Sequence, residues 1–377
     1  MMLVAQVKVL VCADEKERLL ATMRRVNEAC CWVAERALEL KTANKWRLQK
    51  LFYAEVRSHF GLSAQHTVRV FAKVSAAYRR DKSKLCRFTP TGAIAYDERS
   101  YSFRRGFERV SILTLDGRII VDCAVGQSHR ARLEGKRGQA VLTYRKDRGG
   151  FYLLVSVDVP RGSTVEPTGW LGVDLGIRNL AVDSDKQFYS GEKALAARAK
   201  VARFRSALQS RGTKSARRRL RALSRRERRF NTYTNHVISK SIVRKAKDTE
   251  RGIAIEDLSG IRERATVRKA QRARLHSWPF YQLRSFIAYK AALSGVDLVA
   301  VDPRDTSRTC LKCRKVDKAS RRSQSEFVCT GCGLTEHADV IGACNVALRA
   351  EVIRPIVSAA RLGTVDRLLD LSQPQLC

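Results

Sequence analysis

Four cysteines between residues 310 and 332 have the type and spacing that hold a metal ion. They form two Cys-x-x-Cys pairs, Cys310 with Cys313 and Cys329 with Cys332, and 15 residues separate the pairs. Two such pairs can bring four thiolates to the corners of a tetrahedron. The alternative is a set of unrelated redox thiols. The spacing predicts a structural Zn²⁺ ribbon with no coordination position left for catalysis, and the nearby His337 is interpreted as a surface or capping histidine.

Acidic residues inside apolar segments are the second group that could do chemistry. Asp174 lies in "WLGVDLGIRNL", Glu256 and Asp257 lie in "GIAIEDLSG", and Asp339 lies in the first turn of the amphipathic helix predicted within "HADVIGACNVALRA". Each could simply cap a helix or pair with an arginine. Carboxylates from separate elements can instead hold two Mg²⁺ ions about 4 Å apart, one activating the attacking water and one stabilising the leaving oxygen of a phosphodiester.

The strand geometry limits which acids can serve together. In an extended strand Glu256 and Asp257 point to opposite faces, so only one of them can be a direct ligand. The spacing alone does not say which one.

The spacing of apolar residues, and with it the predicted type of secondary structure, changes along the chain. Residues 1–14 open with an alternating strand, and residues 15–85 carry apolar side chains at helical spacing. In residues 86–160 the dipeptide Asp116-Gly117 marks a tight turn between apolar strands, which predicts a small barrel or sandwich.

Residues 161–169 are predicted to form a linker, after which short apolar strands alternate with helices. Residues 192–250 are predicted to form long, very basic helices. A further helix in "SWPFYQLRSFIAYKAALSG" has Ser277 as its N-cap, Pro279 in its first turn and Gly295 at its end. This alternation predicts an α/β domain with a largely buried sheet.

The charge balance points to a polyanionic partner. Seventy-three Lys and Arg outnumber 37 Asp and Glu, which gives a formal net charge of +36. Nucleic acid is the commonest partner for such an excess, although a soluble basic protein without catalysis would show it too. The charge is densest in residues 201–230, with 12 Lys or Arg and a single acid, Glu227. These helices favour contact with RNA or a heteroduplex over a merely solvated charged face.

The compartment follows from what the sequence lacks. No run of about 18 apolar residues is present, so no membrane span is expected. Eleven cysteines without a secretory signal favour metal binding in a reducing compartment over a disulfide framework. A cytoplasmic protein is therefore predicted.

Several motifs resemble a known family. "GVDLGIRNLAV", "IAIEDLSGIR" and "DVIGACNVA" resemble, in order, the three RuvC motifs of the transposon-encoded TnpB proteins, which are RNA-guided nucleases related to the type V CRISPR effectors. "HSWPFYQLRSFIAYKA", "VDPRDTSRTCLKC" and "NEACCWVAERA" also look like this family. The likeness extends over nearly the whole chain in the family's order.

The resemblance implies a function and its site. It implies an RNA-guided DNA endonuclease with Asp174, Glu256 and Asp339 as catalytic Mg²⁺ ligands, and with the four cysteines as ligands of a structural Zn²⁺. The partners would be guide RNA and target DNA, in a prokaryotic cytoplasm and close to the nucleoid. No further cofactor-binding residue is implied.

The resemblance also implies a multidomain α/β chain, in which a RuvC (RNase H-like) nuclease domain carries an inserted zinc ribbon. It adds an N-terminal β-barrel wedge domain with a helical insertion. The predicted segments are the first wedge strand (1–14), the helical recognition insertion (15–85), the rest of the wedge (86–160), the linker (161–169), the RuvC-like domain (170–303), the zinc ribbon (304–335), the third-motif helix (336–350) and a C-terminal tail (351–377).

Two departures from the family pattern concern packing. In the third motif, Ile341 and Gly342 stand where the family usually has Asn and Ala. Arg314 ends the first cysteine knuckle, where glycine is common.

Three other functions stay open at this point. They are a compact type V CRISPR effector, an RNA-guided DNA-binding repressor without cleavage, and a plain RNA-binding protein with a zinc ribbon.

Overall fold

The computed structural model describes residues 1–79, 83–147, 149–164, 166–176, 178–257 and 280–354. By its internal contacts the chain divides into two compact units, Met1–Pro160 and Arg161–Cys377. Ser277 and Pro279, predicted to begin a helix, lie outside the described residues, as does the tail beyond residue 354.

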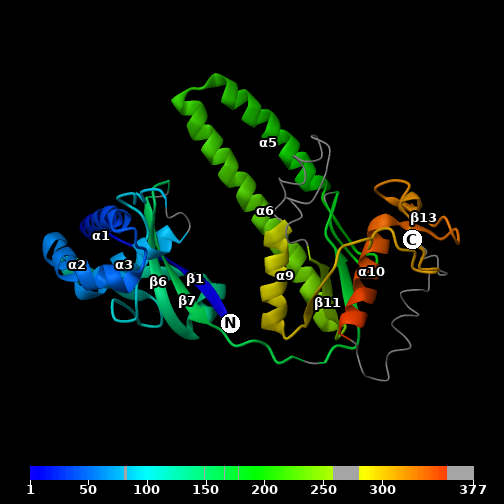
Figure 1. The fold of residues 1–377 in the computed structure, drawn as a ribbon, viewed down its shortest axis with the longest axis horizontal. Helices are drawn as coiled ribbons and strands as arrows, with labels where there is room; N and C mark the ends of the chain where they lie inside the picture. The colour runs from blue at the N-terminus through cyan, green and yellow to red at the C-terminus, as the bar shows by residue number, and fades with distance from the viewer. Residues whose placement is uncertain (80–82, 148, 165, 177, 258–279, 355–377) are drawn as a thin grey trace. The chain divides into compact units, whose positions relative to one another are not determined.

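The first unit is a seven-stranded antiparallel sheet with helices packed on it (Figure 1). The strands run in the order β2-β6-β7-β1-β5-β4-β3. Their bounds are β1 (Met2–Leu10), β2 (Ile94–Tyr96), β3 (Tyr101–Arg104), β4 (Arg109–Thr114), β5 (Gly117–Val125), β6 (Lys136–Arg145) and β7 (Gly150–Asp158). The helices are α1 (Ala13–Glu39), α2 (Lys45–Phe60), α3 (Ala64–Tyr78) and α4 (Gln127–Leu133).

The predicted turn at Asp116 and Gly117 is confirmed, because β4 and β5 pair antiparallel across it and Gly117 has φ +89°. The sheet curls so that side chains of its two edge strands form hydrogen bonds with strands on the opposite side of the sheet. Tyr96 Oη of edge strand β2 donates to Leu113 O of β4 at 3.0 Å, and Tyr101 Oη of β3 donates to Gly138 O of β6 at 2.6 Å. The curled sheet and the helices share one apolar core.

The second unit is built on a five-stranded sheet in the order β10-β9-β8-β11-β12. Strands β8 (Trp170–Asp174), β9 (Asn179–Asp183) and β10 (Phe188–Ser190) form an antiparallel meander. Strands β11 (Gly252–Glu256) and β12 (Leu298–Val301) join β8 in parallel, reached through α5 (Glu192–Arg211), α6 (Lys214–Asp248) and α9 (Phe280–Ser294).

Helices cover the two faces of this sheet differently. Leu171 and Val173 of β8 belong to an apolar cluster that includes residues of α6 and α9. Trp170 of the same strand instead clusters with Val346 and Ala347 of α10 (Ala338–Ile353). Because side chains alternate along a strand, even-numbered residues of β8 face α10 and odd-numbered ones face α6 and α9. The same rule applied to β11 places Ala254 and Glu256 toward α10.

Helices α5 and α6 form a long hairpin that extends away from the sheet (Figure 1). The long basic helices predicted in residues 192–250 are therefore confirmed, with Gly212 (φ +63°) ending α5 and Thr213 capping α6. Between β12 and α10 lies a small module with the 3₁₀ turn η1 (Lys318–Ser320) and the hairpin β13 (Glu326–Val328) and β14 (Thr335–His337).

Candidate active site

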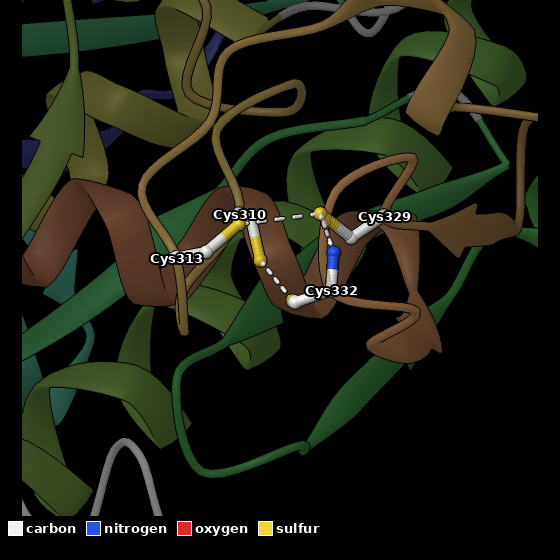
Figure 2. Close-up of side chains that lie close together, drawn as sticks. All are labelled: Cys310, Cys313, Cys329 and Cys332. Carbon is white, nitrogen blue, oxygen red and sulfur yellow. Dashed lines mark hydrogen bonds between the residues drawn. The ribbon is translucent and has the colours of Figure 1, made fainter.

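The four cysteines of the small module converge, and Figure 2 shows their sulfurs turned toward one another. The Sγ atoms of Cys310 and Cys332 lie 3.5 Å apart, as do those of Cys313 and Cys329, and all four lie within 4.8 Å of one another. Zinc–sulfur bonds of about 2.3 Å give tetrahedral sulfur–sulfur edges of about 3.8 Å. The four thiols therefore fit a Zn²⁺ ion.

Backbone amides support the thiolate form that a metal needs. The N–H groups of Cys332 and Gly331 donate to Cys329 Sγ and lower its pKa to about 6. Burial raises the pKa of the Cys310 thiol to about 12, a penalty that a coordinated cation would reverse. The fit is therefore to a metal site and not to four independent thiols.

Arg314, at the end of the first cysteine knuckle, has a backbone conformation that glycine adopts more easily. Its φ is +61°, a left-handed conformation that costs a non-glycine residue about 1 kcal/mol. The turn keeps this conformation all the same, and Arg314 N donates to Cys310 O at 3.2 Å. The departure from the family pattern affects strain in the knuckle and not the ligands.

The three acids singled out from the sequence meet at one end of the second sheet. Asp174 is the last residue of β8 and Glu256 is the last residue of β11. These two strands are neighbours and run parallel, so both acids lie at the same end of the sheet. Asp339 lies in the first turn of α10, which packs on the face that both carboxylates share. Burial raises the pKa of Asp174 well above its usual value, and the carboxylates of Glu256 and Asp339 raise it further. Glu256 and Asp339 therefore both lie near enough to Asp174 for their charges to act on it.

Glu256 and Asp339 each have a neighbour that orients the carboxylate or balances its charge. Thr306 Oγ1 donates to Glu256 Oε1 at 2.6 Å, which opposes the rise in pKa that burial imposes on Glu256. Asn179 Nδ2 donates to Asp339 Oδ2 at 2.9 Å, and the Arg321 guanidinium lies 3.8 Å from Asp339 Oδ1. Sequence reasoning missed these three neighbours because they reach the site only through the fold.

Asp257 takes a different direction from Glu256. Its carboxylate accepts from Arg284 of α9 at 2.6 Å, whereas Glu256 is 8% exposed and faces α10. Of these two acids, only Glu256 shares a face of the sheet with Asp174. In the part of the chain that the structure describes, the cysteine cluster is the one group with ligand atoms tight enough for a single ion. The three carboxylates are spaced more widely, as expected of like charges or of ligands shared between two ions.

Gly342 makes room for the Asp174 carboxylate. A Cβ atom at this position would lie 3.0 Å from Asp174 Oδ2 and 3.3 Å from its Cγ. Ile341, the other departure in the third motif, is fully buried in the core between α10 and the cysteine module. Both residues are therefore compatible with a packed site, and His337 caps α10 as predicted, its Nδ1 accepting from Asp339 N at 3.2 Å.

Fold and site together define an α/β unit with a cluster of three acids at the ends of its central strands and a four-cysteine module before α10. Residues 280–346 match a family model described as "Cas12f1-like, TNB domain", and residues 153–260 match one described as "Probable transposase" (OrfB_IS605). Over these stretches the chain is similar to a transposase family and to the Cas12f1-like family, which confirms the resemblance seen in its motifs.

Curated relatives carry both names. A CRISPR-associated endodeoxyribonuclease Cas12f1 of Syntrophomonas palmitatica is 28% identical over 235 residues, 57% of this chain and 46% of the relative. A TnpB-like protein of Methanocaldococcus jannaschii is 33% identical over 139 residues, 36% of this chain and 49% of the relative. The chain thus spans less than half the length of these relatives.

Solved structures support the fold. The Cas12f1 chain of a complex with guide RNA and target DNA aligns with a TM-score of 0.58 at 14% identity, over 87% of this chain and 82% of that one. At this identity the likeness concerns the fold alone. No helix among the described residues is long and apolar enough to span a membrane.

Proposed function

We propose that the protein is an RNA-guided DNA endonuclease of transposon origin that cleaves target DNA by RuvC-type, two-metal phosphodiester hydrolysis. The observation that carries the proposal is the convergence of Asp174, Glu256 and Asp339 from two strands and a helix. The relationship to nucleases and the charge of +36 support it. Guide pairing would read the target next to a short adjacent motif.

The proposed site works through the placement of its carboxylates. Asp174, Glu256 and Asp339 would hold two Mg²⁺ ions, which supply an activated water and neutralise the leaving oxygen. Thr306 and Asn179 fix the orientation of two of these carboxylates by hydrogen bonds. The Arg321 guanidinium opposes the rise in pKa that burial imposes on Asp174 and Glu256, which favours the ionised form that binds a cation.

The segment boundaries stand as part of the proposal. Residues 170–303 and 336–350 would form the RuvC-like domain, a class that the sheet order and the acidic edge support. Residues 304–335 would be its zinc ribbon. Residues 1–14 and 86–160 would form the wedge and residues 15–85 the recognition insertion, supported by a curled sheet and three helices in those places.

The match of residues 280–346 to a Cas12f1-like domain favours a second candidate, a compact type V CRISPR effector with the same site. A repeat array beside the gene would support that candidate, and a flanking transposon would support the first. Both predict guided cleavage, whereas an RNA-guided repressor or a plain RNA-binding protein predicts none.

The decisive test uses two adjacent carboxylates. RNA that co-purifies with the chain is sequenced, and plasmids carrying the matching target are incubated with the complex and Mg²⁺. Glu256→Gln should abolish cleavage while RNA is retained, because the amide cannot replace a carboxylate ligand. The matched control Asp257→Asn should cleave at the wild-type level, since Asp257 pairs with Arg284 of α9. Cleavage by the Glu256 variant at the wild-type rate would overturn the assignment.

A further inference from the structure

One loop of the second unit joins the cysteine module to the acid at the end of β11. This loop, residues 302–309, follows β12 and ends immediately before Cys310, the first cysteine of the module. Thr306, in the middle of the loop, is 3% exposed, and its Oγ1 donates to Glu256 Oε1 at 2.6 Å. The position of the loop therefore acts directly on the Glu256 carboxylate.

The Thr306 hydroxyl can donate to only one acceptor at a time, because it carries a single proton. Two oxygens lie within its reach, Glu256 Oε1 at 2.6 Å and Pro303 O at 3.1 Å. The shorter contact is to the carboxylate, and hydrogen bonds to charged acceptors are the stronger ones. A shift of the loop that favoured the carbonyl oxygen would leave Glu256 without this donor. The direction of the Glu256 carboxylate thus depends on where the backbone of Thr306 is held.

Helix α10 holds that backbone through one buried amide side chain. Asn345 is 3% exposed, and its Nδ2 donates to Thr306 O and to Thr309 O, both at 2.8 Å. The amide nitrogen has two protons, so both are used. One turn further along α10, Arg349 Nη1 donates to Asp302 O at 2.6 Å in a contact exposed to solvent. Side chains four residues apart share a face of a helix, so one face of α10 holds three carbonyl oxygens of the loop.

We propose that Asn345 is a positioning residue for the acids, because through Thr306 it fixes the direction in which Glu256 presents its carboxylate to a divalent cation. This inference rests on the proposed function, since it concerns the same three carboxylates. It gives α10 a role at each of them. The helix carries Asp339, makes room for Asp174 at Gly342, and orients Glu256 through Asn345.

Binding of Mn²⁺ to the zinc-loaded full chain, measured by electron paramagnetic resonance, tests the Thr306 step. Thr306→Val keeps the shape of the side chain and removes the hydroxyl. It should weaken Mn²⁺ binding about 10- to 100-fold, the usual effect of removing a group that orients a metal ligand. Thr306→Ser keeps the hydroxyl and should bind Mn²⁺ as the wild type does.

The Asn345 step is tested by a double-mutant cycle. Asn345→Leu nearly keeps the volume and removes both donors, so it should weaken Mn²⁺ binding about tenfold. The double variant with Thr306→Val should bind no more weakly than Thr306→Val alone, because both changes act on one hydrogen bond. Should Asn345→Leu fail to fold, Asn345→Ser tests the same step, since its shorter side chain cannot reach both carbonyl oxygens.

Cys344→Ala is the matched control on α10. Cys344 is 3% exposed and precedes Asn345, but its Sγ donates to Ser184 O at 3.6 Å and not to the loop. This variant should lower the free energy of unfolding and leave the Mn²⁺ affinity unchanged, as expected of a residue that only stabilises the fold. If Asn345→Leu behaves in the same way, or if its loss of affinity adds to that of Thr306→Val, the proposal is overturned.

Asp174→Asn distinguishes failure of this inference from failure of the proposed function. It should abolish the tight Mn²⁺ binding of the wild type. If it binds Mn²⁺ as the wild type does, the acids do not hold the cation, and the proposed function and the inference both fail. If it loses Mn²⁺ while the Asn345 and Thr306 variants keep it, the inference alone fails.

Discussion

Gly172 is the position where one added methyl group should separate β8 and α10, the elements that carry Asp174 and Asp339. A Cβ atom on Gly172 would lie 1.9 Å from Ala343 O and 2.7 Å from Ala347 N, both backbone atoms of α10. Real Cβ contacts are not found under 3.0 Å, so β8 and α10 must move apart by about 1.1 Å. No flexible side chain can absorb this movement.

The magnitude follows from that displacement. Forcing extra volume into a packed contact costs about 1–3 kcal/mol, and a backbone clash lies at the upper end of this range. Asp174 lies two residues further along β8 and Asp339 lies on α10, so the same movement pulls their carboxylates apart. A misplacement of about 1 Å can cost about a hundredfold in rate. Gly172→Ala should therefore lower both the free energy of unfolding and the cleavage rate by these amounts.

Denaturant unfolding and single-turnover cleavage measure the two effects. The matched control is Gly138→Ala, in strand β6, where a Cβ atom would meet Ser156 O at 3.9 Å, an ordinary contact. That variant should unfold and cleave as the wild type does. A Gly172→Ala variant with the wild-type unfolding midpoint and cleavage rate would refute the close packing of α10 on β8 and the geometry derived from it.

Three further predictions concern metals and pH. Cys313→Ser should lose the bound zinc measured by elemental analysis, whereas Cys12→Ser, at an exposed cysteine outside the module, should keep it. Mg²⁺ at 100 times its Kd should stabilise the wild type by about 2.7 kcal/mol in thermal unfolding. Asp174→Asn should remove this response. The same variant should stabilise the metal-free protein, because it removes a buried charge that Glu256 and Asp339 repel. Burial lowers the pKa of His66 to about 4, so the unfolded chain takes up its proton first as the pH falls. The stability that neutral His66 provides is thus present above pH 6.5 and lost toward pH 4, by about 3 kcal/mol. A His66→Gln variant with the same pH slope as the wild type in urea unfolding would contradict this.

Local chemistry was enough to predict much of the fold. Asp116 and Gly117 predict their hairpin because a tight turn needs residues that accept positive φ. The cysteine pairs predict a metal module because two knuckles at that spacing form a tetrahedron. Both patterns are complete within short stretches of chain.

The contacts among the three acids and their neighbours could not be predicted in this way. Whether Glu256 or Asp257 faces Asp174 depends on which side of the sheet α10 covers, a choice made by packing between distant segments. Thr306 and Arg321 reach the acids from loops whose sequence shows no periodicity. Tyr78 and Phe88 flank a basic stretch, and the sequence alone does not say whether their rings lie in the core or on the surface. Tyr78 is 3% exposed with its hydroxyl bonded to Ala34 O, and Phe88 packs against the same core.

The most direct test is to locate divalent ions in crystals of the chain grown with Mn²⁺, by anomalous scattering. The proposal predicts two peaks about 4 Å apart, bound by oxygens of Asp174, Glu256 and Asp339, and a separate zinc peak among the four cysteines. Zinc at the cysteines with no manganese at the three carboxylates would contradict the account.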